Sequence, residues 1–389
     1  MKTQKEDKLS IVFLSNFLNH HQLPLCMELY RLSGGKFQFI ATEAVERERL
    51  AMGYADMNND YDFVIKFYED RGKELAEKIL IDADVVIIGG VDLPFRYVHK
   101  RLKKKKLTFF YSERIFRAGW KIKPWDPRMI RYMYRNFIRY DGSNYFLLCA
   151  GSYVWDDFKR YRIFKDRAIK WGYFPKGNDA LSNKDTDDAE IKVLFVGRSL
   201  ALKHPEKAVF LFEQLIQRGY KANLTMIGQG EMRPVIEDQI SALGLTDFIT
   251  LIDKVNYEDV LEYMNQADIF LFLSGAEEGW GAVLNEAMSC GCAVLASRDA
   301  GATDYLIKDG ENGFSYRNSD EMYDKFFQLA ENAELRMKIG EQAYHTINKA
   351  WSYRIAAERL YSLSQKWYEG NLSFYDNGPC SPAWEFYEE

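Results

Sequence analysis

Four charged side chains in the second half of the chain have the types and spacing to hold a diphosphate and the sugars attached to it. Glu278 and Glu286 are separated by seven residues and stand on either side of a Gly-Trp-Gly turn. Arg198 and Lys203 follow an apolar run, "IKVLFVG", that is typical of a buried strand. Arginine is a fork-shaped donor and lysine a compact cation, so the pair can neutralise and hydrogen-bond a diphosphate.

The glycine turn and the helix predicted after it would add to this attraction. Gly279 and Gly281 have no Cβ, so their backbone can approach a ligand closely. The first N–H groups of the helix and its dipole favour an anion; these groups belong to Ala282, Val283 and Leu284. A carboxylate beside phosphates would instead accept hydrogen bonds from sugar hydroxyls. We therefore predict a nucleotide sugar as ligand, with Glu278 and Glu286 at its opposite ends.

Each of these residues also has a structural interpretation that needs no ligand. Glu286 alone would be a solvated helix acid, and Arg198 and Lys203 alone would be surface charges. Their joint placement, each near a strand end and in this order, favours the ligand site. Gly197, in the same loop as Arg198, is included in the predicted site. The loop "MIGQGE", which contains Gly228, is less decisive, because its glycines could contact the nucleotide or only turn the chain.

Alternating strand-like and helix-like segments predict an α/β fold with parallel sheets. "LSIVFLS", "DVVIIGG" and "LTFFYS" are strands of a first series, and "IKVLFVG", "KANLTMIGQG" and "DIFLFLS" are strands of a second. Between them, residues 172–190 lose the apolar period and are predicted to be a linker. The expected organisation is an N-terminal acceptor-binding domain at residues 1–175, a nucleotide-sugar domain at 188–350, and a final helix with a tail at 351–389.

Composition limits the class of protein. The chain has 389 residues, 47% of them apolar and 28% charged, which is ordinary for a soluble enzyme of two domains. We find no apolar run long enough to span a bilayer, and the charged first residues do not resemble a signal peptide. The five cysteines show no metal-binding spacing. We expect a cytoplasmic location, either free or peripherally bound to the inner face of the plasma membrane.

Several motifs together resemble a known family. "GRSLALK", "MIGQGE", "YMNQADIFLFLS", "EEGWGAVLNEAM" and "DGENGF" are similar, in this order, to motifs of the retaining glycosyltransferases of family 4. The resemblance covers roughly residues 191–314 and is weak before them. It implies the GT-B fold, in which two Rossmann-like doubly wound domains face each other across a cleft and the final helix crosses back to the N-terminal domain. It also implies transfer of a hexosyl-type sugar from a nucleotide donor, UDP- or GDP-linked, to a glycan or lipid-linked acceptor.

The resemblance assigns a role to each matching residue. It implies that Glu278 contacts the transferred sugar, that Glu286 binds the ribose, and that Arg198 and Lys203 bind the diphosphate. The turn centred on Trp280 would lie along the sugar. Members of the family need no metal or other cofactor for these contacts, and "DAD" at residues 82–84 is better interpreted as a helix stop than as a metal motif. We expect retention of configuration, with the two cations stabilising the departing diphosphate.

The first half departs from the family pattern. Many members have a glycine-rich turn after the first strand, where this chain has "NFLNHHQ". Asn19, His20 and His21 are candidate acceptor-binding residues there, with His20 also a catalytic candidate. The alternatives are that one of the histidines meets the phosphates, or that these histidines cap or pack. The segment "YSERIFRAG" stands where members often carry a histidine near the donor sugar. It supplies Glu113 as a catalytic candidate and Arg114 as an acceptor-binding candidate.

Charge is distributed unequally between the two halves. Residues 1–180 contain 33 Lys and Arg against 23 Asp and Glu, a balance of +10, and the remainder has a balance of −15. Residues 96–140 alone contain 15 basic residues and only two acidic ones, with aromatic residues between them. This composition favours an anionic membrane surface or a lipid-diphosphate acceptor. The alternatives are a solvated basic face over buried aromatics, or nucleic acid, which the donor motifs argue against.

The sequence as a whole predicts a metal-independent retaining glycosyltransferase, working in the synthesis of a bacterial surface polysaccharide or glycoconjugate. Two alternatives remain open. One is another GT-B enzyme, such as a sugar-nucleotide epimerase or a phosphorylase, and a phosphorylase would show the absorption of pyridoxal phosphate. The other is a non-catalytic protein that binds glycans or partner proteins, which would show no turnover.

Overall fold

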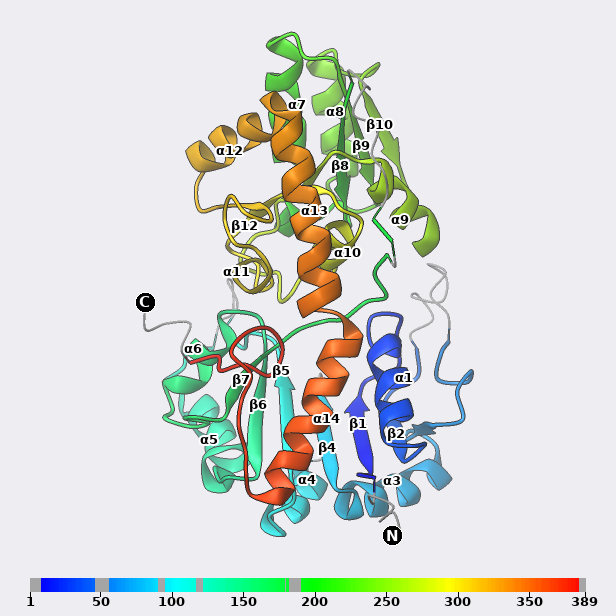
Figure 1. The fold of residues 1–389 in the computed structure, drawn as a ribbon, viewed down its shortest axis with the longest axis vertical. Helices are drawn as coiled ribbons and strands as arrows, with labels where there is room; N and C mark the ends of the chain where they lie inside the picture. Colours follow the sequence, from blue (N-terminus) through cyan, green and yellow to red (C-terminus); the bar gives the residue numbers. More distant parts are fainter. Residues whose placement is uncertain are drawn as a thin grey trace, which may run out of the picture. The chain divides into compact units, whose positions relative to one another are not determined.

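The computed structural model describes residues 8–45, 56–89, 95–116, 122–178, 180–181 and 190–384. They form two compact units (Figure 1). The first unit contains the described residues up to Pro175 and those from Tyr353 onward, and the second contains Lys176–Ser352. Within the predicted linker, residues 172–175 thus belong to the first unit and residues 176–178 to the second. Residues 179 and 182–189 of that linker lie outside the described residues.

The first unit is built on a seven-stranded sheet with the order β3-β2-β1-β4-β5-β6-β7, and all its ladders are parallel. The runs "IVFLS" and "VVIIG" are buried along their whole length, as expected for strands covered on both faces. The strands are β1 (Ile11–Ser15), β2 (Phe37–Ala41), β3 (Val64–Lys66), β4 (Val85–Gly89), β5 (Thr108–Ser112), β6 (Tyr145–Ala150) and β7 (Ala168–Trp171).

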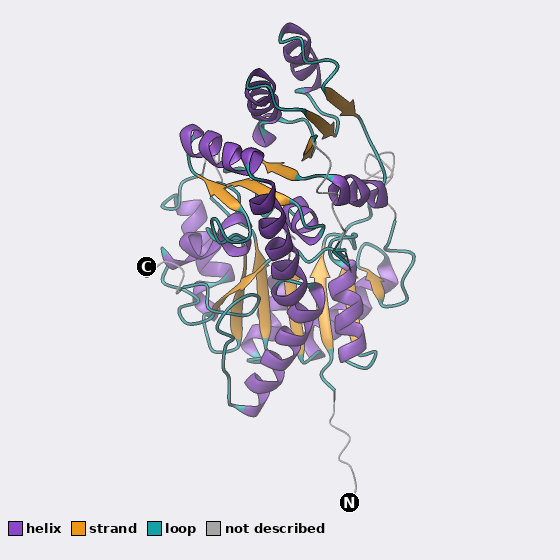
Figure 2. Cartoon of the chain, turned by 45° about the horizontal axis from the view of Figure 1, so that its top comes forward, coloured by secondary structure: helices purple, strands orange, loops and turns teal. Residues whose placement is uncertain are grey.

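Helices of the first unit lie in front of and behind its strands (Figure 2). The final helix of the chain packs against the first one, so the end of the sequence is part of this unit. The helices are α1 (Leu23–Leu32), α3 (Asp70–Asp82), α4 (Phe95–Lys103), α5 (Pro127–Asn136), η1 (Ile138–Tyr140), α6 (Val154–Lys159) and α14 (Tyr353–Glu369). None of the helices formed by the described residues has the length and apolar character needed to span a lipid bilayer.

One arginine of the basic stretch is a structural residue. Arg101 is fully buried, and its guanidinium donates to the carbonyl oxygens of Ala83 and Leu107 and to Thr108 Oγ1, as well as to two further carbonyls. These acceptors lie in and just after the last turn of α3 and at or just before the starts of β4 and β5. Burial lowers the pKa of Arg101 to about 10, which leaves it charged at neutral pH. It therefore ties three elements together and adds nothing to the basic surface.

The second unit has a six-stranded parallel sheet with the order β10-β9-β8-β11-β12-β13. Counted within the unit this is 3-2-1-4-5-6, the order of a Rossmann fold, in which ligands bind where the strand order reverses. That point lies between β8 and β11. The strands are β8 (Ile191–Val196), β9 (Ala222–Ile227), β10 (Ile249–Ile252), β11 (Ile269–Phe272), β12 (Ala293–Ser297) and β13 (Phe314–Tyr316).

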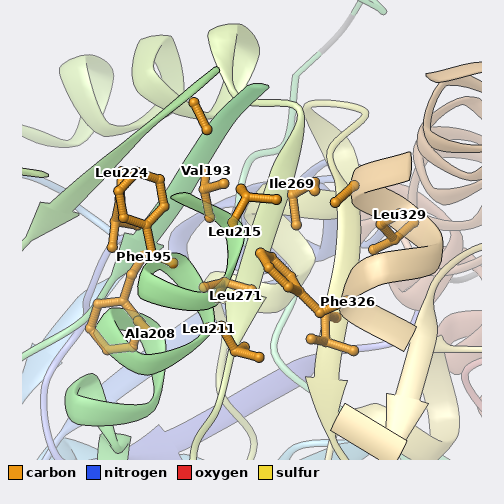
Figure 3. Packing of buried hydrophobic residues seen from close by; sticks show 14 of the residues in the cluster. Val193, Phe195, Ala208, Leu211, Leu215, Leu224, Ile269, Leu271, Phe326 and Leu329 are labelled. Carbon is orange, nitrogen blue, oxygen red and sulfur yellow. The ribbon is translucent and has the colours of Figure 1, made fainter. Parts of the chain in front are cut away.

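A core of the second unit lies between its strands and several of its helices. Figure 3 shows side chains of β8 and β11, including Val193 and Ile269, meeting Leu215 of α7 and Phe326 of α12. The helical elements of this unit are η2 (Ala201–Lys203), α7 (Pro205–Gln217), α8 (Arg233–Ala242), α9 (Tyr257–Gln266), α10 (Val283–Ser289), α11 (Thr303–Leu306), α12 (Ser319–Glu331) and α13 (Ala333–Ala350). The predicted fold class, two doubly wound α/β domains with parallel sheets, is confirmed.

Candidate functional site

Three of the predicted donor residues of the second unit come from two loops at the point where its strand order reverses. The loop after β8 carries Arg198 and Lys203, and the loop after β11 carries Glu278. A backbone hydrogen bond of 2.8 Å from the Gly275 N–H to the Leu202 carbonyl joins the two loops. The sheet topology thus brings together groups that are 75 residues apart in the sequence, as the motif order predicted.

Lys203 and Glu278 form an ion pair, and each side chain is only 16% exposed. The sequence assigned them to adjacent parts of one ligand, but it did not predict this direct contact. Because the pair is partly shielded from solvent, its attraction is stronger than that of an exposed pair. Arg198, in the same loop as Lys203, is exposed to solvent. Without a ligand, therefore, one cation of the predicted diphosphate site is exposed and the other is neutralised.

The loop after β9 packs against the backbone of the Arg198 loop and holds it in place. Gly228 has a φ of +137°, and a Cβ there would lie 2.1 Å from the carbonyl oxygen of Gly197. Gly230 is equally close to the backbone of Ser199, whose N–H donates to Gln229 and whose carbonyl accepts from Met232. Gly228 was left open between contacting the nucleotide and turning the chain. The structure gives it a packing role that holds the Arg198 loop in place.

The Gly-Trp-Gly turn is supported from inside the unit. Gly281 has a φ of +89°, and a Cβ there would lie 2.3 Å from the ring of Phe272, so glycine is required at this position. The Trp280 side chain is only 1% exposed, and its Nε1 donates to Asn285 Oδ1 at 2.8 Å. The indole packs beside Trp351 and Tyr305 in the core, so it supports the turn from inside. That the turn lies along the sugar stays a prediction.

The start of α10 has fewer unpaired backbone N–H groups for a phosphate than the sequence predicted. The N–H of Leu284 donates to the Gly281 carbonyl at 3.0 Å, and the Leu284 side chain is buried. Leu284 therefore shapes the turn and cannot offer that N–H to a phosphate in this structure. Ala282 is the residue that caps the helix, and Val283 is its first residue. For Gly279, Ala282 and Val283 a contact with the donor stays a prediction.

Glu286 lies in α10, as predicted, but in a buried environment. Its side chain is 5% exposed, and burial raises its pKa to about 8, against the opposing effect of a hydrogen bond with Tyr257. The Tyr257 hydroxyl also lies 2.8 Å from the Lys176 carbonyl, a second acceptor for its single proton. In the absence of ligand Glu286 is therefore largely protonated at neutral pH. This differs from the solvated helix acid that the sequence left as the alternative.

Tyr257 is a residue that the sequence analysis did not single out. It is the first residue of α9, and Asn256 before it caps this helix by accepting from the Asp259 N–H at 2.8 Å. The cap fixes where the helix begins and so places the tyrosine against Glu286. An Asn followed by an aromatic residue at a helix start predicts the cap, but not the long-range contact with the acid.

In the first unit the strand order also reverses next to β1, and the candidates Asn19, His20 and His21 follow that strand. Asn19 Oδ1 accepts from the N–H groups of His21 and Gln22, at 3.0 and 3.1 Å, so this side chain stabilises the turn that leads into α1. The two histidine rings lie 3.8 Å apart between centroids. Asn19 therefore has a structural role here, while the histidines remain candidates.

Both histidines are neutral at physiological pH. Burial lowers the pKa of His20, and burial together with the neighbouring His20 lowers the pKa of His21 to about 3. A neutral imidazole can accept or donate a hydrogen bond, but it cannot neutralise a phosphate. The loop after β1 therefore suits an uncharged group such as a sugar hydroxyl.

Tyr173 contacts both His21 and Glu113, the candidate from the segment after β5. Its hydroxyl donates to Glu113 Oε1 at 3.0 Å, and its ring lies edge-on to His21 with centroids 6.2 Å apart. Arg114 turns elsewhere and stacks on the Tyr153 ring, 4.9 Å from its centroid. Glu113 and His21 thus lie on either side of one tyrosine. The sequence analysis missed Tyr173 because the segment around it has no apolar period and was assigned to the linker.

Comparison with known proteins finds sequence similarity in the second unit. Residues 179–346 match the family model described as Glycosyl transferases group 1. The alpha-D-kanosaminyltransferase of Streptomyces kanamyceticus is 30% identical over 176 residues, which cover 45% of this chain and 45% of that protein. The N-acetyl-alpha-D-glucosaminyl L-malate synthase of Bacillus anthracis is 25% identical over 162 residues, 41% of each chain. The chain thus matches about half the length, or less, of these relatives.

Solved structures extend the likeness to both units. HepE of Anabaena in complex with UDP aligns with a TM-score of 0.66 at 14% identity, over 92% of this chain and 100% of that chain. At this identity the match shows the fold alone, and the fold is GT-B, as predicted. The sequence evidence is confined to the second unit, where the motifs around Arg198 and Glu278 lie. The sequence likeness to the glycosyl transferases of group 1 spans residues 179–346, which is less than half of this chain.

Proposed function

We propose that the protein is a glycosyltransferase that moves a sugar from a nucleoside diphosphate sugar to a glycan or lipid-linked acceptor. The observation that carries this proposal is the ion pair of Lys203 with Glu278 where the strand order of the second unit reverses, inside the segment that matches the family. Arg198 is exposed in the same loop as Lys203. Two cations suit a diphosphate, and a carboxylate beside them suits the hydroxyls of an attached sugar. One ligand that offers both groups is a nucleotide sugar.

The proposed donor is held by the second unit. Arg198 and Lys203 bind the diphosphate, Glu286 accepts from the ribose hydroxyls, and Glu278 accepts from the transferred sugar. Because Lys203 and Glu278 are paired before the donor arrives, the diphosphate and the sugar replace the two halves of that pair. Similarly, Glu286 exchanges its hydrogen bond with Tyr257 for one from the ribose. Each group thus has a partner both before and after binding, so that no charge is left buried alone.

The reaction we propose is a front-face substitution with retention of configuration. The bond between the anomeric carbon and the diphosphate oxygen breaks, and a bond to the acceptor oxygen forms on the same face. Negative charge grows on the diphosphate as it leaves, and Arg198 and Lys203 stabilise that charge. These two side chains can supply the positive charge by themselves, so we propose that transfer needs no metal ion. We further propose that the first unit holds the acceptor near His20, His21 and Glu113.

The comparisons support this assignment without fixing the substrates. One relative, 22% identical over 174 residues, is a GDP-mannose-dependent mannosyltransferase of Corynebacterium glutamicum, and solved structures of HepE contain UDP and UDP-glucose. UDP- and GDP-linked hexoses are therefore the first donors to test. WaaG, of similar fold, is a glycosyltransferase of lipopolysaccharide biosynthesis. We propose a role in bacterial surface polysaccharide or glycoconjugate synthesis, at the inner face of the plasma membrane.

The test begins with binding and ends with stereochemistry. Thermal-shift screening with UDP, GDP and their sugars should single out one base, since a ligand at 100 times its Kd stabilises by about 2.7 kcal/mol. Turnover with the matching sugar is then measured with EDTA present, and the anomeric configuration of the product is read by NMR. An inverted product would overturn retention alone, and loss of turnover in EDTA would overturn metal independence alone. No nucleotide binding under any condition would sink the proposed function.

A further inference from the structure

The helix α5 in the first unit presents an outward face on which apolar and basic side chains lie in parallel stripes. Ile130 and Tyr134 are four residues apart and are 47% and 55% exposed. Arg131 and Arg135, the next position along in each case, are also exposed. Residues four apart fall on the same side of a helix, so the aliphatic-aromatic stripe runs beside the arginine stripe.

The buried side of α5 determines which of its side chains face outward. Met129 and Met133 are buried in the core of the first unit, together with Phe137 just after the helix. The N-terminus of α5 is capped by Asp126, whose carboxylate accepts from the Arg128 N–H at 2.8 Å. Packing and capping thus hold the outer stripes towards solvent.

The most exposed aromatic residue of the chain's described part stands at the start of this face. Trp125 is 71% exposed, and the turn that carries it is anchored on both sides. Before it, the Pro124 carbonyl accepts from the Tyr161 hydroxyl at 2.7 Å; after it, the Asp126 N–H donates to Lys123 at 3.0 Å. A large indole held in the open in this way has no packing role within the unit.

Positive charge continues from α5 onto neighbouring elements. Arg135 of α5, Arg139 of η1 and Lys103 of α4 all lie close enough to His99 to contribute to the lowering of its pKa, after the larger effect of burial. The Arg139 guanidinium lies 4.9 Å from the centre of the Tyr140 ring. The sequence of α5 contains no acid. Residues 117–121, which the sequence analysis counted in the same basic stretch, lie outside the described residues.

We propose that the outer face of α5, with Trp125 at its start, docks the protein onto an anionic lipid bilayer. Arginines at the edge of a helix attract anionic headgroups, while the exposed indole and the Ile130 and Tyr134 side chains enter the boundary between headgroups and acyl chains. The helix would then lie in the plane of the interface. This proposal rests on charge and exposure in the first unit, and it stands whether or not the second unit proves to transfer sugars.

Two other occupants fit this face less well. A second copy of the chain, docked symmetrically, would bring the arginine stripe against its own copy, and like charges in contact repel. A nucleic acid would be attracted by the arginines and could stack on Trp125. It offers nothing, however, to Ile130, an aliphatic side chain with neither a stacking surface nor a hydrogen-bonding group.

The test is flotation of the full-length protein with vesicles of phosphatidylcholine alone and of phosphatidylcholine mixed with phosphatidylglycerol. Wild type should float only with the anionic vesicles, more strongly at low salt. The variant Arg131→Ser/Arg135→Ser should lose about fivefold per arginine, or roughly 30-fold in its partition coefficient. Lys338→Ser/Lys349→Ser, which removes two exposed cations from α13 of the second unit, is the matched control and should float like wild type.

A second variant separates apolar insertion from attraction between charges. Trp125→Ser/Ile130→Ser keeps all the cations, so it should retain the salt-sensitive part of binding and lose the part that survives high salt. Brominated lipids should quench wild-type tryptophan fluorescence on binding, and Trp125→Phe should remove most of that quenching.

Three results would overturn the proposal. Equal flotation with both kinds of vesicle, or no flotation with either kind even at low salt, would show that no such surface exists. An equal loss in the α13 control would show that only overall charge matters. Tighter binding of a single-stranded oligonucleotide than of vesicles, with loss on Arg131→Ser/Arg135→Ser, would assign the face to nucleic acid.

Discussion

The loops after β1 and after β8 occupy equivalent places in their two sheets, but they carry different chemistry. After β8, Arg198 and Lys203 supply two cations, and one of them is paired with Glu278. After β1, His20 and His21 are neutral because burial lowers their pKa values. The same fold position is therefore suited to an anion in the second unit and to an uncharged polar group in the first. Fold alone does not decide which substrate a unit holds.

The largest expected effect comes from removing positive charge from the loop after β8, because that charge is what distinguishes it from the loop after β1. Arg198→Ala should weaken free nucleotide by about ten- to a hundredfold, since charge-assisted bonds contribute roughly 1.5–3 kcal/mol. Turnover should fall further, by about a hundred- to a thousandfold, because the same group stabilises the leaving diphosphate. Calorimetry and turnover measure the two effects. His20→Ala, at the equivalent loop of the first unit, is the control and should leave nucleotide affinity unchanged.

A second test uses the buried acid. Glu286→Gln should weaken free nucleotide by roughly tenfold or more, because an amide accepts from the ribose less strongly than a carboxylate. Wild-type affinity should rise with pH up to about 8, the pKa of Glu286, as the proton is lost, and the variant should lack that rise. Calorimetry across this pH range measures both. Identical pH profiles for wild type and variant would contradict the assignment.

The stability of the ligand-free protein should show the same titration with a defined sign. Between the ordinary pKa of 4.5 and the raised value of about 8, the folded protein binds a proton at Glu286 that the unfolded chain does not. The free energy of unfolding of wild type should therefore decrease as pH rises through this window. Glu286→Gln has no proton to lose, so its stability relative to wild type should increase from acid to alkaline pH and then level off. Thermal or denaturant unfolding with pH checks this.

A smaller effect on binding should separate the two glutamates. Glu278→Gln should slow transfer, since the sugar is no longer positioned for front-face attack. Free nucleotide should bind as well as before or a few-fold better, because Lys203 is released from its pair. Glu277→Gln, the exposed acid next to it, is the matched control for both readouts. Equal losses of nucleotide affinity in Glu278→Gln and Glu286→Gln would refute the placement of the two acids at opposite ends of the donor.

The last test concerns the first unit and should affect the acceptor alone. Tyr173→Phe removes the hydrogen bond to Glu113 and keeps the ring beside His21. If the first unit holds the acceptor, the KM for the acceptor should rise by roughly tenfold, because Glu113 loses the hydrogen bond that positions it. Hydrogen bonds to charged groups contribute about this much. Nucleotide affinity should not change. A loss of nucleotide affinity, with acceptor KM intact, would remove the distinction between the two loops.

The sequence predicted the elements well and the environments of single residues less well. "DVVIIGG" and "DIFLFLS" contain β4 and β11 because continuous apolar runs are typical of strands covered on both faces. The burial of the Trp280 side chain was not predicted because the motif gives residue types, whereas burial depends on Tyr305 and Trp351, which are distant in sequence. Arg101 was counted as surface charge for the same reason. Its carbonyl partners are backbone groups, which no side-chain pattern records.

The ion pair between Lys203 and Glu278 has a consequence for turnover if the second unit binds as proposed. A complete donor satisfies both members of the pair, since its diphosphate replaces Glu278 beside Lys203 and its sugar replaces Lys203 beside Glu278. The spent nucleotide satisfies only the lysine, and it must compete with the glutamate for it. The pair therefore acts as a discriminator between substrate and product. It lowers the occupancy of the site by spent nucleotide and relieves the product inhibition that a permanently open cationic site would suffer.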